Sequence, residues 1–359
     1  MILTILTFAI ILIILVVIHE AGHFFAAKLM GIKVEEFGFG LPPRAWGKKI
    51  GETIYSLNWL PIGGFVRLYG EDAMHPETVK KERSRAFFAK KPWQRSIVLT
   101  AGVTMNFLLG WLLIAYLFNI GLPVPTGNVK VIEALPDSPA EKAGIQSEDI
   151  IQSLSTPTNK TISLHTIQEL VNVLQKYPDT EVTVNIQRDN TIEYIRVTPK
   201  YLEDTKSVGI GVVISDSVIE QYSTIPDRIT HGFSYSIYLI KATIEGLGDT
   251  LKKLFTGDVK NIQVGGIILI GQAVGEARKV GTDSLLYLVG FLSLNLALIN
   301  ALPIPALDGG HLIFVLFEGI TGKKMKPQWE TNLHQIGMIF LLLLMVLITI
   351  NDILRLRAG

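Results

Sequence analysis

The strongest pattern in the sequence is a set of long apolar runs separated by polar segments. Four runs stand out, at residues 1–28, 96–122, 285–317 and 333–353. Each is long enough to cross about 30 Å of hydrocarbon as a helix. The hydrophobic content of 48% and the mean hydropathy of +0.38 are high for a soluble protein. The pattern predicts a polytopic α-helical membrane protein with about four transmembrane helices.

Basic residues between the runs predict the orientation. Residues 28–91 hold twelve Lys or Arg, and the loop between the third and fourth runs holds Lys323, Lys324 and Lys326. By the positive-inside rule both loops should be cytoplasmic, which places both termini and residues 123–284 outside. The first run has no basic n-region and no small-residue cleavage site, so we expect it to be retained.

A β region is expected between the first two runs, at residues 29–95. Within it, residues 53–59 and 64–69 have the composition of two short strands, joined by the turn at 61–64. The apolar content of this segment predicts a membrane-associated hairpin or sheet that dips toward the bilayer. A solvated hairpin on the cytoplasmic side is the alternative.

The outer region begins with a soluble α+β pattern at residues 125–203. A capped short helix at 138–144 and a helix near 164–176 are followed by two alternating strands. This order resembles a PDZ domain, in which an extended peptide adds to a strand beside a helix. The groove would lie between the strand at 129–131 and the helix at 164–176. A spacer or size filter that binds nothing is the alternative.

Residues 204–284 are expected to form an extracytoplasmic linker with an amphipathic helix. Apolar residues recur at helical spacing over 227–256, which is typical of a helix lying on the outer membrane face. A short apolar helix should start at Val264 and lead into the third run.

The motif His-Glu-x-x-His lies at the end of the first run. His19 and His23 are four positions apart, so on a helix both rings can face one metal ion. Glu20 follows the first ligand and is placed to take a proton from water. Ionisable groups in an apolar helix are costly and usually functional. A chance match near a helix end is the alternative reading.

A catalytic zinc site needs a third protein ligand. The sequence has no cysteine, so that ligand must be His, Asp or Glu. Asp308 is the only acid in the third run, and Pro303 and Pro305 just before it must interrupt the helix. His311, one turn later, is the rival. We favour Asp308 and expect His311 to lie beside the site.

These motifs together resemble the site-2 protease family of intramembrane zinc endopeptidases, most closely the bacterial type that regulates sigma-E. The resemblance covers nearly the full chain. It rests on His19–His23, Gly38-Phe39-Gly40, Pro61–Phe65, Ala101-Gly102 with Asn106, one PDZ-like domain, and Asn300 with Pro303–Gly309. It implies that His19, His23 and Asp308 bind Zn²⁺ and that Glu20 is the catalytic acid/base.

The resemblance also implies how substrate is held. Asn300 and Pro305 would seat an unwound substrate, and a re-entrant strand containing Gly64, Phe65 and Val66 would clamp it. The implied substrates are single-span membrane proteins, such as anti-sigma factors or signal-peptide remnants, in the lipid bilayer of a bacterial cytoplasmic membrane. Val103 stands where the family usually has proline, and several relatives have two PDZ domains where this chain has room for one.

Two other function classes compete with a protease. A membrane scaffold could recruit partners through the PDZ-like domain and keep an inactive metal site. A metal transporter could line its path with the same ligands, although Glu20 would then have no role. The net charge of +1 gives no indication of a nucleic-acid partner.

Overall fold

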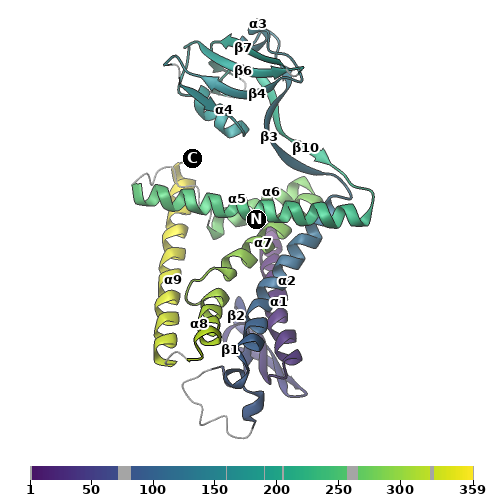
Figure 1. Ribbon diagram of the computed structural model, residues 1–359, viewed down its shortest axis with the longest axis vertical. Helices are drawn as coiled ribbons and strands as arrows, with labels where there is room; N and C mark the ends of the chain where they lie inside the picture. The colour runs from purple at the N-terminus through teal and green to yellow at the C-terminus, as the bar shows by residue number, and fades with distance from the viewer. Residues whose placement is uncertain are drawn as a thin grey trace. The chain divides into compact units, whose positions relative to one another are not determined.

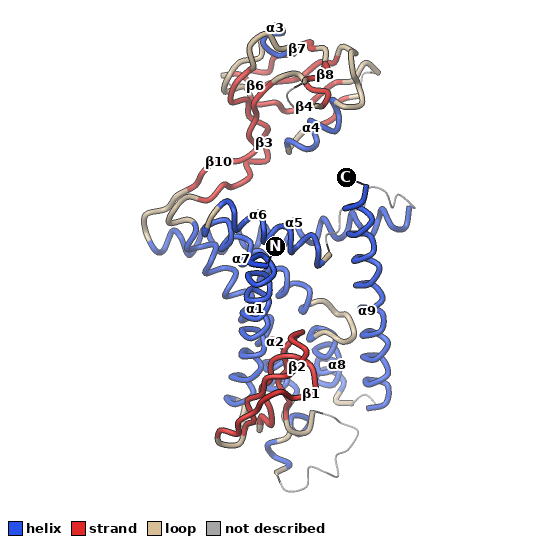
Figure 2. The backbone as a smooth tube through the Cα atoms, turned by 180° about the vertical axis from the view of Figure 1, so that it is seen from behind, coloured by secondary structure: helices blue, strands red, loops and turns tan. Residues whose placement is uncertain are grey.

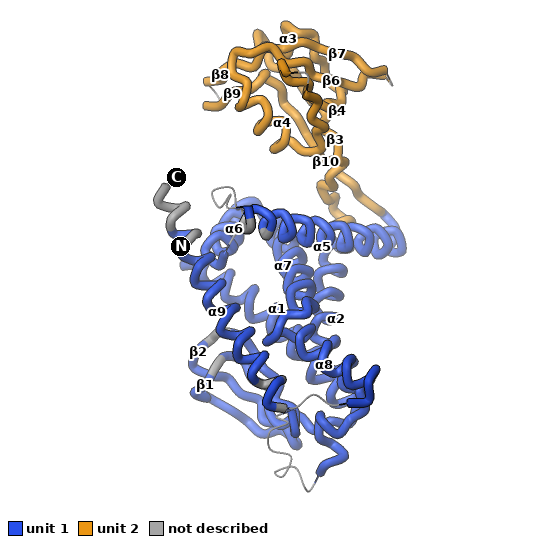
Figure 3. Tube along the Cα trace, turned by 60° about the vertical axis from the view of Figure 1, so that its left-hand side comes forward, with its two compact units in different colours: residues 1–117, 223–359 blue, residues 118–222 orange. Residues whose placement is uncertain are grey.

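The computed structural model describes residues 2–71, 82–158, 160–189, 191–203, 206–256, 266–323 and 327–358. The chain divides into two compact units (Figure 3). Unit 1 combines residues 1–117 with residues 223–359, and unit 2 is residues 118–222.

Unit 1 is mainly helical. Its elements, in chain order, are α1 (Ile2–Leu29), β1 (Val34–Ile50), β2 (Thr53–Leu68), the short 3-10 helices η2 (Arg83–Arg85) and η3 (Phe87–Ala89), α2 (Pro92–Leu117), α5 (Ile225–Thr256), α6 (Ile267–Val280), α7 (Thr282–Ala301), α8 (Asp308–Thr321) and α9 (Pro327–Ala358). Residues Val264 and Gly265, where a short helix was expected to begin, lie outside the described residues.

Four helices in the described part of the chain are long and apolar enough to cross a membrane. They are Ile2–Leu29, Pro92–Leu117, Thr282–Ala301 and Asn332–Ile350. The expected interruption of the third run is confirmed, because α7 ends at Ala301 and α8 starts at Asp308. Prolines at 303 and 305 explain the break, since proline cannot donate a backbone hydrogen bond.

Glycines allow the apolar helices to approach closely. A Cβ on Gly22 of α1 would lie 2.7 Å from the carbonyl carbon of Ala101 in α2. A Cβ on Gly110 of α2 would lie 2.6 Å from Leu294 of α7. Small residues at helix crossings are the usual device of membrane helix packing. The helix α2 is therefore packed tightly between α1 and α7.

The arrangement within unit 1 can be followed in Figures 1 and 2. The helix α5 runs across the ends of α1, α2 and α7, and the β1–β2 sheet lies at their opposite ends. The start of α1 and the end of α9 both lie on the α5 side. Trp111 of α2 donates its indole N–H to the Ile229 carbonyl of α5 at 2.9 Å, which fixes this crossing.

The β region differs from the expected hairpin. The strand β2 is continuous over 53–68, and it pairs with β1 rather than with itself. The segment Glu36–Phe39 of β1 has partners on both sides, Ile54–Leu57 and Gly64–Arg67. The turn of the hairpin is at Gly51, whose φ of +62° suits glycine. The expected hairpin was wrong in its pairing, because residues 36–39 lie between the two segments. The chain does reverse near the expected turn, since the register against residues 36–39 rises along 54–57 and falls along 64–67.

This hairpin turn is tied to the helices by charge. Glu52 accepts hydrogen bonds from Lys28 at the end of α1 at 2.5 Å and from Arg85 of η2 at 2.7 Å. These two bonds lower the pKa of the Glu52 carboxyl below its ordinary value. The sheet is thus anchored at the end of α1 that follows the histidine motif.

Unit 2 is a small α+β domain. Its elements are β3 (Leu122–Ala134), α3 (Pro139–Ala143), β4 (Ile150–Ser155), β5 (Thr161–Ser163), α4 (Ile167–Leu174), β6 (Val182–Arg188), β7 (Thr191–Val197), β8 (Lys200–Leu202), β9 (Ser207–Gly209) and β10 (Val212–Glu220). The sheet has the order β10-β3-β4-β6-β7, with β5 paired to β4. Ser138 caps α3, and Thr166 and Glu169 form a capping box on α4.

Two expectations for unit 2 were wrong. Residues 207–220, expected to be linker, form β9 and β10, so the unit extends beyond residue 203. The strand at 129–131 offers no edge for a peptide, because Val131 pairs with Ile214 and Val129 pairs with Ile151. The strand beside α4 is β10, since the Ile167 N–H donates to Asp216 at 3.3 Å. Because β10 pairs with β3, the exposed edge of the sheet beside α4 is β10 and not the strand at 129–131.

Candidate metal centre

The two histidines of the motif lie in α1, and their rings point toward the same place. Both are buried, with 7% exposure for His19 and 9% for His23. Their Nε2 atoms are 3.3 Å apart. Because residues four apart share a helix face, the local periodicity of α1 is sufficient to bring them together.

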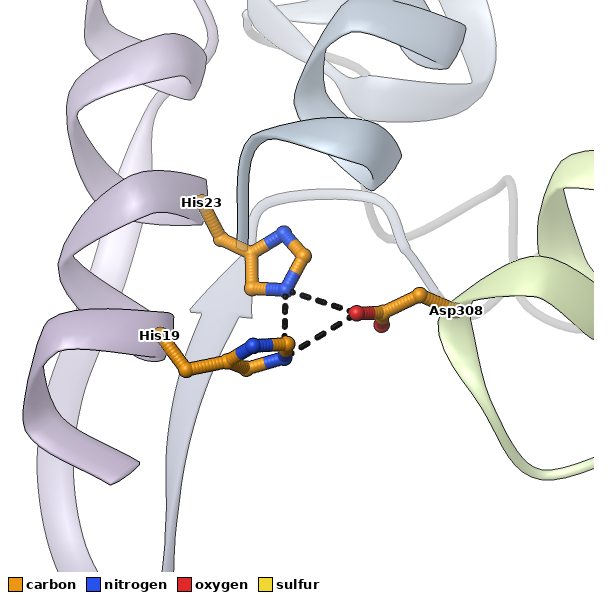
Figure 4. A group of neighbouring side chains, drawn as sticks. All are labelled: His19, His23 and Asp308. Carbon is orange, nitrogen blue, oxygen red and sulfur yellow. Dashed lines mark hydrogen bonds and ion pairs between the residues drawn. The ribbon is translucent and has the colours of Figure 1, made fainter. Parts of the chain in front are cut away.

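Asp308 completes the group from the far end of the chain. Its Oδ2 atom lies 3.0 Å from Nε2 of His19 and 3.2 Å from Nε2 of His23 (Figure 4). This oxygen is buried and has no hydrogen-bond partner among the described residues. As the first residue of α8, Asp308 projects from the break between α7 and α8.

The geometry of the three atoms fits a tetrahedral metal ion. The three ligand atoms lie within 4.8 Å of one another. Zinc bonds of about 2.0–2.1 Å at tetrahedral angles would place ligand atoms about 3.3 Å apart, close to the separations of 3.0, 3.2 and 3.3 Å. Two imidazoles and one carboxylate form the donor set of a catalytic zinc site with an open fourth position.

Each histidine has a partner on its other ring nitrogen. Nδ1 of His23 lies 2.8 Å from the Val98 carbonyl, so an Nδ1–H donates there and leaves Nε2 free for a metal. Nδ1 of His19 lies 3.2 Å from the amide of Asn106, which is fully buried. The Asn106 main-chain carbonyl accepts from Ser293 of α7 at 2.7 Å.

Asn106 also has a buried Oδ1 without a partner in the described structure. The oxygen and nitrogen of an amide side chain are assigned from their surroundings. With a metal on Nε2 of His19, its Nδ1 carries the proton and needs an acceptor. Turning the amide so that Oδ1 faces Nδ1 supplies that acceptor, which makes Asn106 a fitting partner for a metal-bound histidine.

Gly102 gives the rings their space. A Cβ on this residue would lie 2.8 Å from Cε1 of His19 and would overlap Nε2 of His23. No other residue type can occupy this position without displacing the imidazoles. Sequence reasoning assigned no role to Gly102 or Asn106, although two residues four apart on α2 share a face and could have been aligned with the His19–His23 face.

Glu20 is held against the β sheet. A Cβ on Gly64 of β2 would lie 2.9 Å from Cγ of Glu20 and 2.8 Å from Val16. The Val66 backbone N–H faces the Glu20 carboxylate, which interacts electrostatically with His19, His23 and Asp308. The structure therefore brings Gly64 and Val66 to the candidate base itself.

The other candidate residues lie around this centre. Phe65 packs its ring on Gly38, and Asn300 lies in the last turn of α7. Pro305 is in the break and contacts Gly337 of α9. His311 stacks on His334 with ring centroids 3.6 Å apart, and it is not among the three grouped ligands.

The sequence profile of Peptidase family M50 matches residues 7–344. A Clostridium perfringens protein named as a predicted zinc metalloprotease is 36% identical over 343 residues, covering 95% of each chain. The Bacillus subtilis regulator of sigma-W protease RasP is 28% identical, covering 98% of this chain and 99% of its own. The zinc metalloprotease RasP of Oceanobacillus iheyensis is 29% identical with the same coverage.

Two solved structures resemble a part of the chain. The PDZ domain of an SdrC-like protein from Listeria monocytogenes is 18% identical, with a TM-score of 0.23, and covers 26% of this chain and 95% of its own. The corresponding domain from Listeria innocua is 21% identical, with a TM-score of 0.21, and covers 24% and 92%. The family profile and the full-length relatives together show that the chain belongs to peptidase family M50, the site-2 proteases, and is a zinc metalloprotease.

Proposed function

We propose that this protease cleaves peptide bonds inside the transmembrane segment of single-span membrane proteins. The observation that carries the proposal is the position of the metal centre. His19 and His23 are buried within an apolar helix of 28 residues, α1, which carries no charged residue before Glu20. With about 1.5 Å per residue, His23 lies about 9 Å inside the end of that helix. A peptide bond must enter the apolar layer to reach this site.

The ligands in this proposal are His19, His23 and Asp308. A zinc ion there would lower the pKa of a coordinated water toward about 7 and polarise the substrate carbonyl. Val98 and Asn106 orient the two imidazoles so that both Nε2 lone pairs face the centre. Asp308 contributes the negative charge that balances the site.

Glu20 is the proposed general acid/base. It faces the centre without being one of the three grouped ligands, which leaves its carboxylate free to accept a proton. Contact with Gly64 and the Val66 N–H limits its rotamers. Once water has given its proton to Glu20 and its oxygen has attacked the substrate carbonyl, the same carboxyl can return the proton to the leaving amine.

A helical substrate must unwind, because its carbonyls are hydrogen-bonded within the helix. The segment 64–67 of β2 supports strand addition, since it pairs with residues 36–39 on one side and contacts Glu20. Phe65 would pack on the incoming chain. Asn300 and Pro305, at the break between α7 and α8, would help to seat the opened segment, with the Asn300 side chain as its polar partner.

The same proposal includes topology and partners. The β1–β2 sheet with its basic flanks would face the cytoplasm of a bacterium, and both termini with unit 2 would lie outside the cytoplasmic membrane. Unit 2 has the helix and strand order of a PDZ-like domain, with β10 at the sheet edge beside α4. It would bind an extended peptide or act as a filter that admits already trimmed substrates, such as anti-sigma factors or signal-peptide remnants.

Cleavage of a purified single-span substrate in detergent tests the function. The full chain, loaded with zinc, should cut within the substrate's apolar span, as mapped by mass spectrometry of the fragments. Glu20→Gln and a chelator should each prevent the cut. A soluble peptide with the same cleavage sequence is the matched control. Equal cutting of that peptide, or cuts only outside the span, would contradict intramembrane cleavage.

A further inference from the structure

The segment between α7 and α8 carries Asp308 at its end. Local backbone bonds hold Ile304 and Leu307, whose N–H groups donate to Leu302 at 2.7 Å and to Ile304 at 3.1 Å, but neither bond involves the Ala306 N–H. Ala306 has a φ of +78°, which is unusual for a residue with a Cβ. Leu307, at the N-cap of α8, makes no side-chain capping bond. The partner of the Ala306 N–H, just before Asp308, comes from elsewhere in the chain.

That partner lies in α9. The Ala306 backbone N–H donates to Nδ1 of His334 at 2.8 Å. One turn further along α9, a Cβ on Gly337 would lie 2.6 Å from Cβ of Pro305 and would overlap its carbonyl oxygen. Two successive residues of the break, Pro305 and Ala306, thus rest directly on one face of α9.

The His334 ring is itself held by α8. It stacks on His311 with centroids 3.6 Å apart and an interplanar angle of 15°. Phe314 meets it edge-on at 5.5 Å. The imidazole is therefore clamped by α8 while its Nδ1 is aimed at the chain just before the metal ligand.

We propose that His334 is a positioning residue for the metal centre, whose Nδ1 fixes the Ala306 N–H and thereby the approach of Asp308 to His19 and His23. This inference rests on the proposed ligand role of Asp308. The positive φ of Ala306 persists only where surrounding structure enforces it, and the Nδ1 bond is the contact that meets its N–H.

The contact also links the position of α9 to the metal site. The most apolar 18-residue window within Asn332–Ile350 is only 6% buried, so α9 packs lightly on the unit along this stretch. Near its other end, Asp352 accepts from the N–H groups of Gly266 at 3.1 Å and Leu269 at 3.4 Å, at the start of α6. Movement of α9 at the His334 end would be transmitted to Asp308 through Ala306.

A purely space-filling role for His334 predicts different mutant behaviour. In His334→Asn the side-chain Oδ1 takes the place of Nδ1 and can accept the Ala306 N–H. In His334→Gln the oxygen falls where Nε2 was and cannot. The two amides differ by one methylene group, and glutamine fills more of the lost ring volume. Packing alone would therefore favour glutamine, and the Nδ1 bond favours asparagine.

The zinc affinity of the purified full chain, measured by chelator competition, distinguishes a packing role from the Nδ1 hydrogen bond. The absorption spectrum of the Co²⁺-substituted protein reports the geometry of the metal ligands. We expect His334→Gln and His334→Ala to bind zinc about 10- to 100-fold more weakly, the range found for residues that orient metal ligands. His334→Asn should remain near wild type with an unchanged Co²⁺ spectrum. Met338→Ala, an exposed position on α9, is the matched control.

Equal zinc affinity of the Asn and Gln variants, or wild-type affinity of His334→Ala, would overturn the inference. If neither amide variant folds, Gly337→Ala tests the same contact, because it pushes α9 from Pro305 and keeps the imidazole. Wild-type zinc affinity in that variant would also contradict it. Asp308→Ala is the control for the proposed ligand role of Asp308, and it should lose zinc. If Asp308→Ala keeps zinc, Asp308 is not a ligand, and the proposed function fails separately from the role of His334.

Discussion

The two sides of the metal centre are built differently. On the α1–α2 side, His19 and His23 project from the C-terminal half of a continuous helix, and Val98, Gly102 and Asn106 of one neighbouring helix orient them. On the α8–α9 side, Asp308 follows a broken helix whose path depends on a separate helix, α9. A buried ion pair between Arg95 and Glu318 joins α2 to α8.

This difference assigns separate tasks to the two sides. The helices α1 and α2 pack closely through glycine contacts, so we expect the histidine side to be rigid. Asp308 is reached through a short segment that contacts α9, so its position depends on α9 as well as on α2. If substrate enters from the bilayer as proposed, we expect this side to move.

The largest effect is expected from Glu20→Gln, which leaves both sides of the frame intact. The substitution keeps the shape and removes the proton acceptor, so cleavage should fall by about 10²-fold or more. Zinc content should match that of the wild type, because Glu20 is not among the grouped ligands. Zinc analysis and fragment yield on the same preparation check this. Near wild-type cleavage would exclude Glu20 as the base.

Gly102→Ala should damage the fixed side almost as strongly. The added methyl group would collide with both imidazoles, and displacement of about 1 Å can cost about 10²-fold in rate. Gly271→Ala in α6 is the matched control, because nothing lies within 4 Å of that position. Activity and zinc affinity of the two variants provide the comparison. Equal behaviour would show that the α1–α2 crossing can relax.

Asn106→Ala should have an intermediate effect on the same side. It removes the partner of Nδ1 in His19, and loss of such partners costs about 10- to 100-fold in metal affinity or activity. Asn106→Asp should restore much of the zinc affinity, since a carboxylate accepts the Nδ1 proton. Chelator competition on both variants measures the effect. An alanine variant with full zinc affinity would remove Asn106 from the site.

Val66→Pro should slow cleavage of helical substrates while zinc stays bound. Proline removes the N–H that faces Glu20 and interrupts the edge of the sheet. Steady-state rates on a helical and on an already extended substrate separate these contributions. A loss confined to the helical substrate indicates strand addition, and a loss on both indicates the Glu20 contact. An unchanged rate on both would place the substrate elsewhere.

Removal of unit 2 should have the smallest effect on the metal centre. The Tyr222 N–H donates to the Phe118 carbonyl at 2.9 Å, so residues 119–221 can be replaced by a short glycine-serine linker. Zinc content should be unchanged, and cleavage of substrates with large outer domains should rise relative to trimmed ones if unit 2 is a filter. Zinc loss on deletion would give unit 2 a structural role at the site.

The same contrast explains how much the sequence could predict. His19, Glu20 and His23 needed only the helical period, and the break before Asp308 needed only the chemistry of proline. Three features depend on residues far apart in the sequence. They are the strand pairing of residues 34–50, the pairing of β10 with β3, and the contact of His334 with Ala306. No local pattern encodes them, because glycine spacing and isolated polar residues become informative only when the neighbouring helix is known.

The central claim is that Asp308 joins His19 and His23 in binding zinc. It is tested most directly by zinc stoichiometry and affinity of Asp308→Asn and His311→Ala, measured on the full chain in detergent beside the wild type. The account predicts that Asp308→Asn binds zinc at least about tenfold more weakly and loses cleavage, while His311→Ala keeps its zinc and part of its activity. Full zinc binding and cleavage in Asp308→Asn, together with loss of both in His311→Ala, would contradict it and make His311 the third ligand.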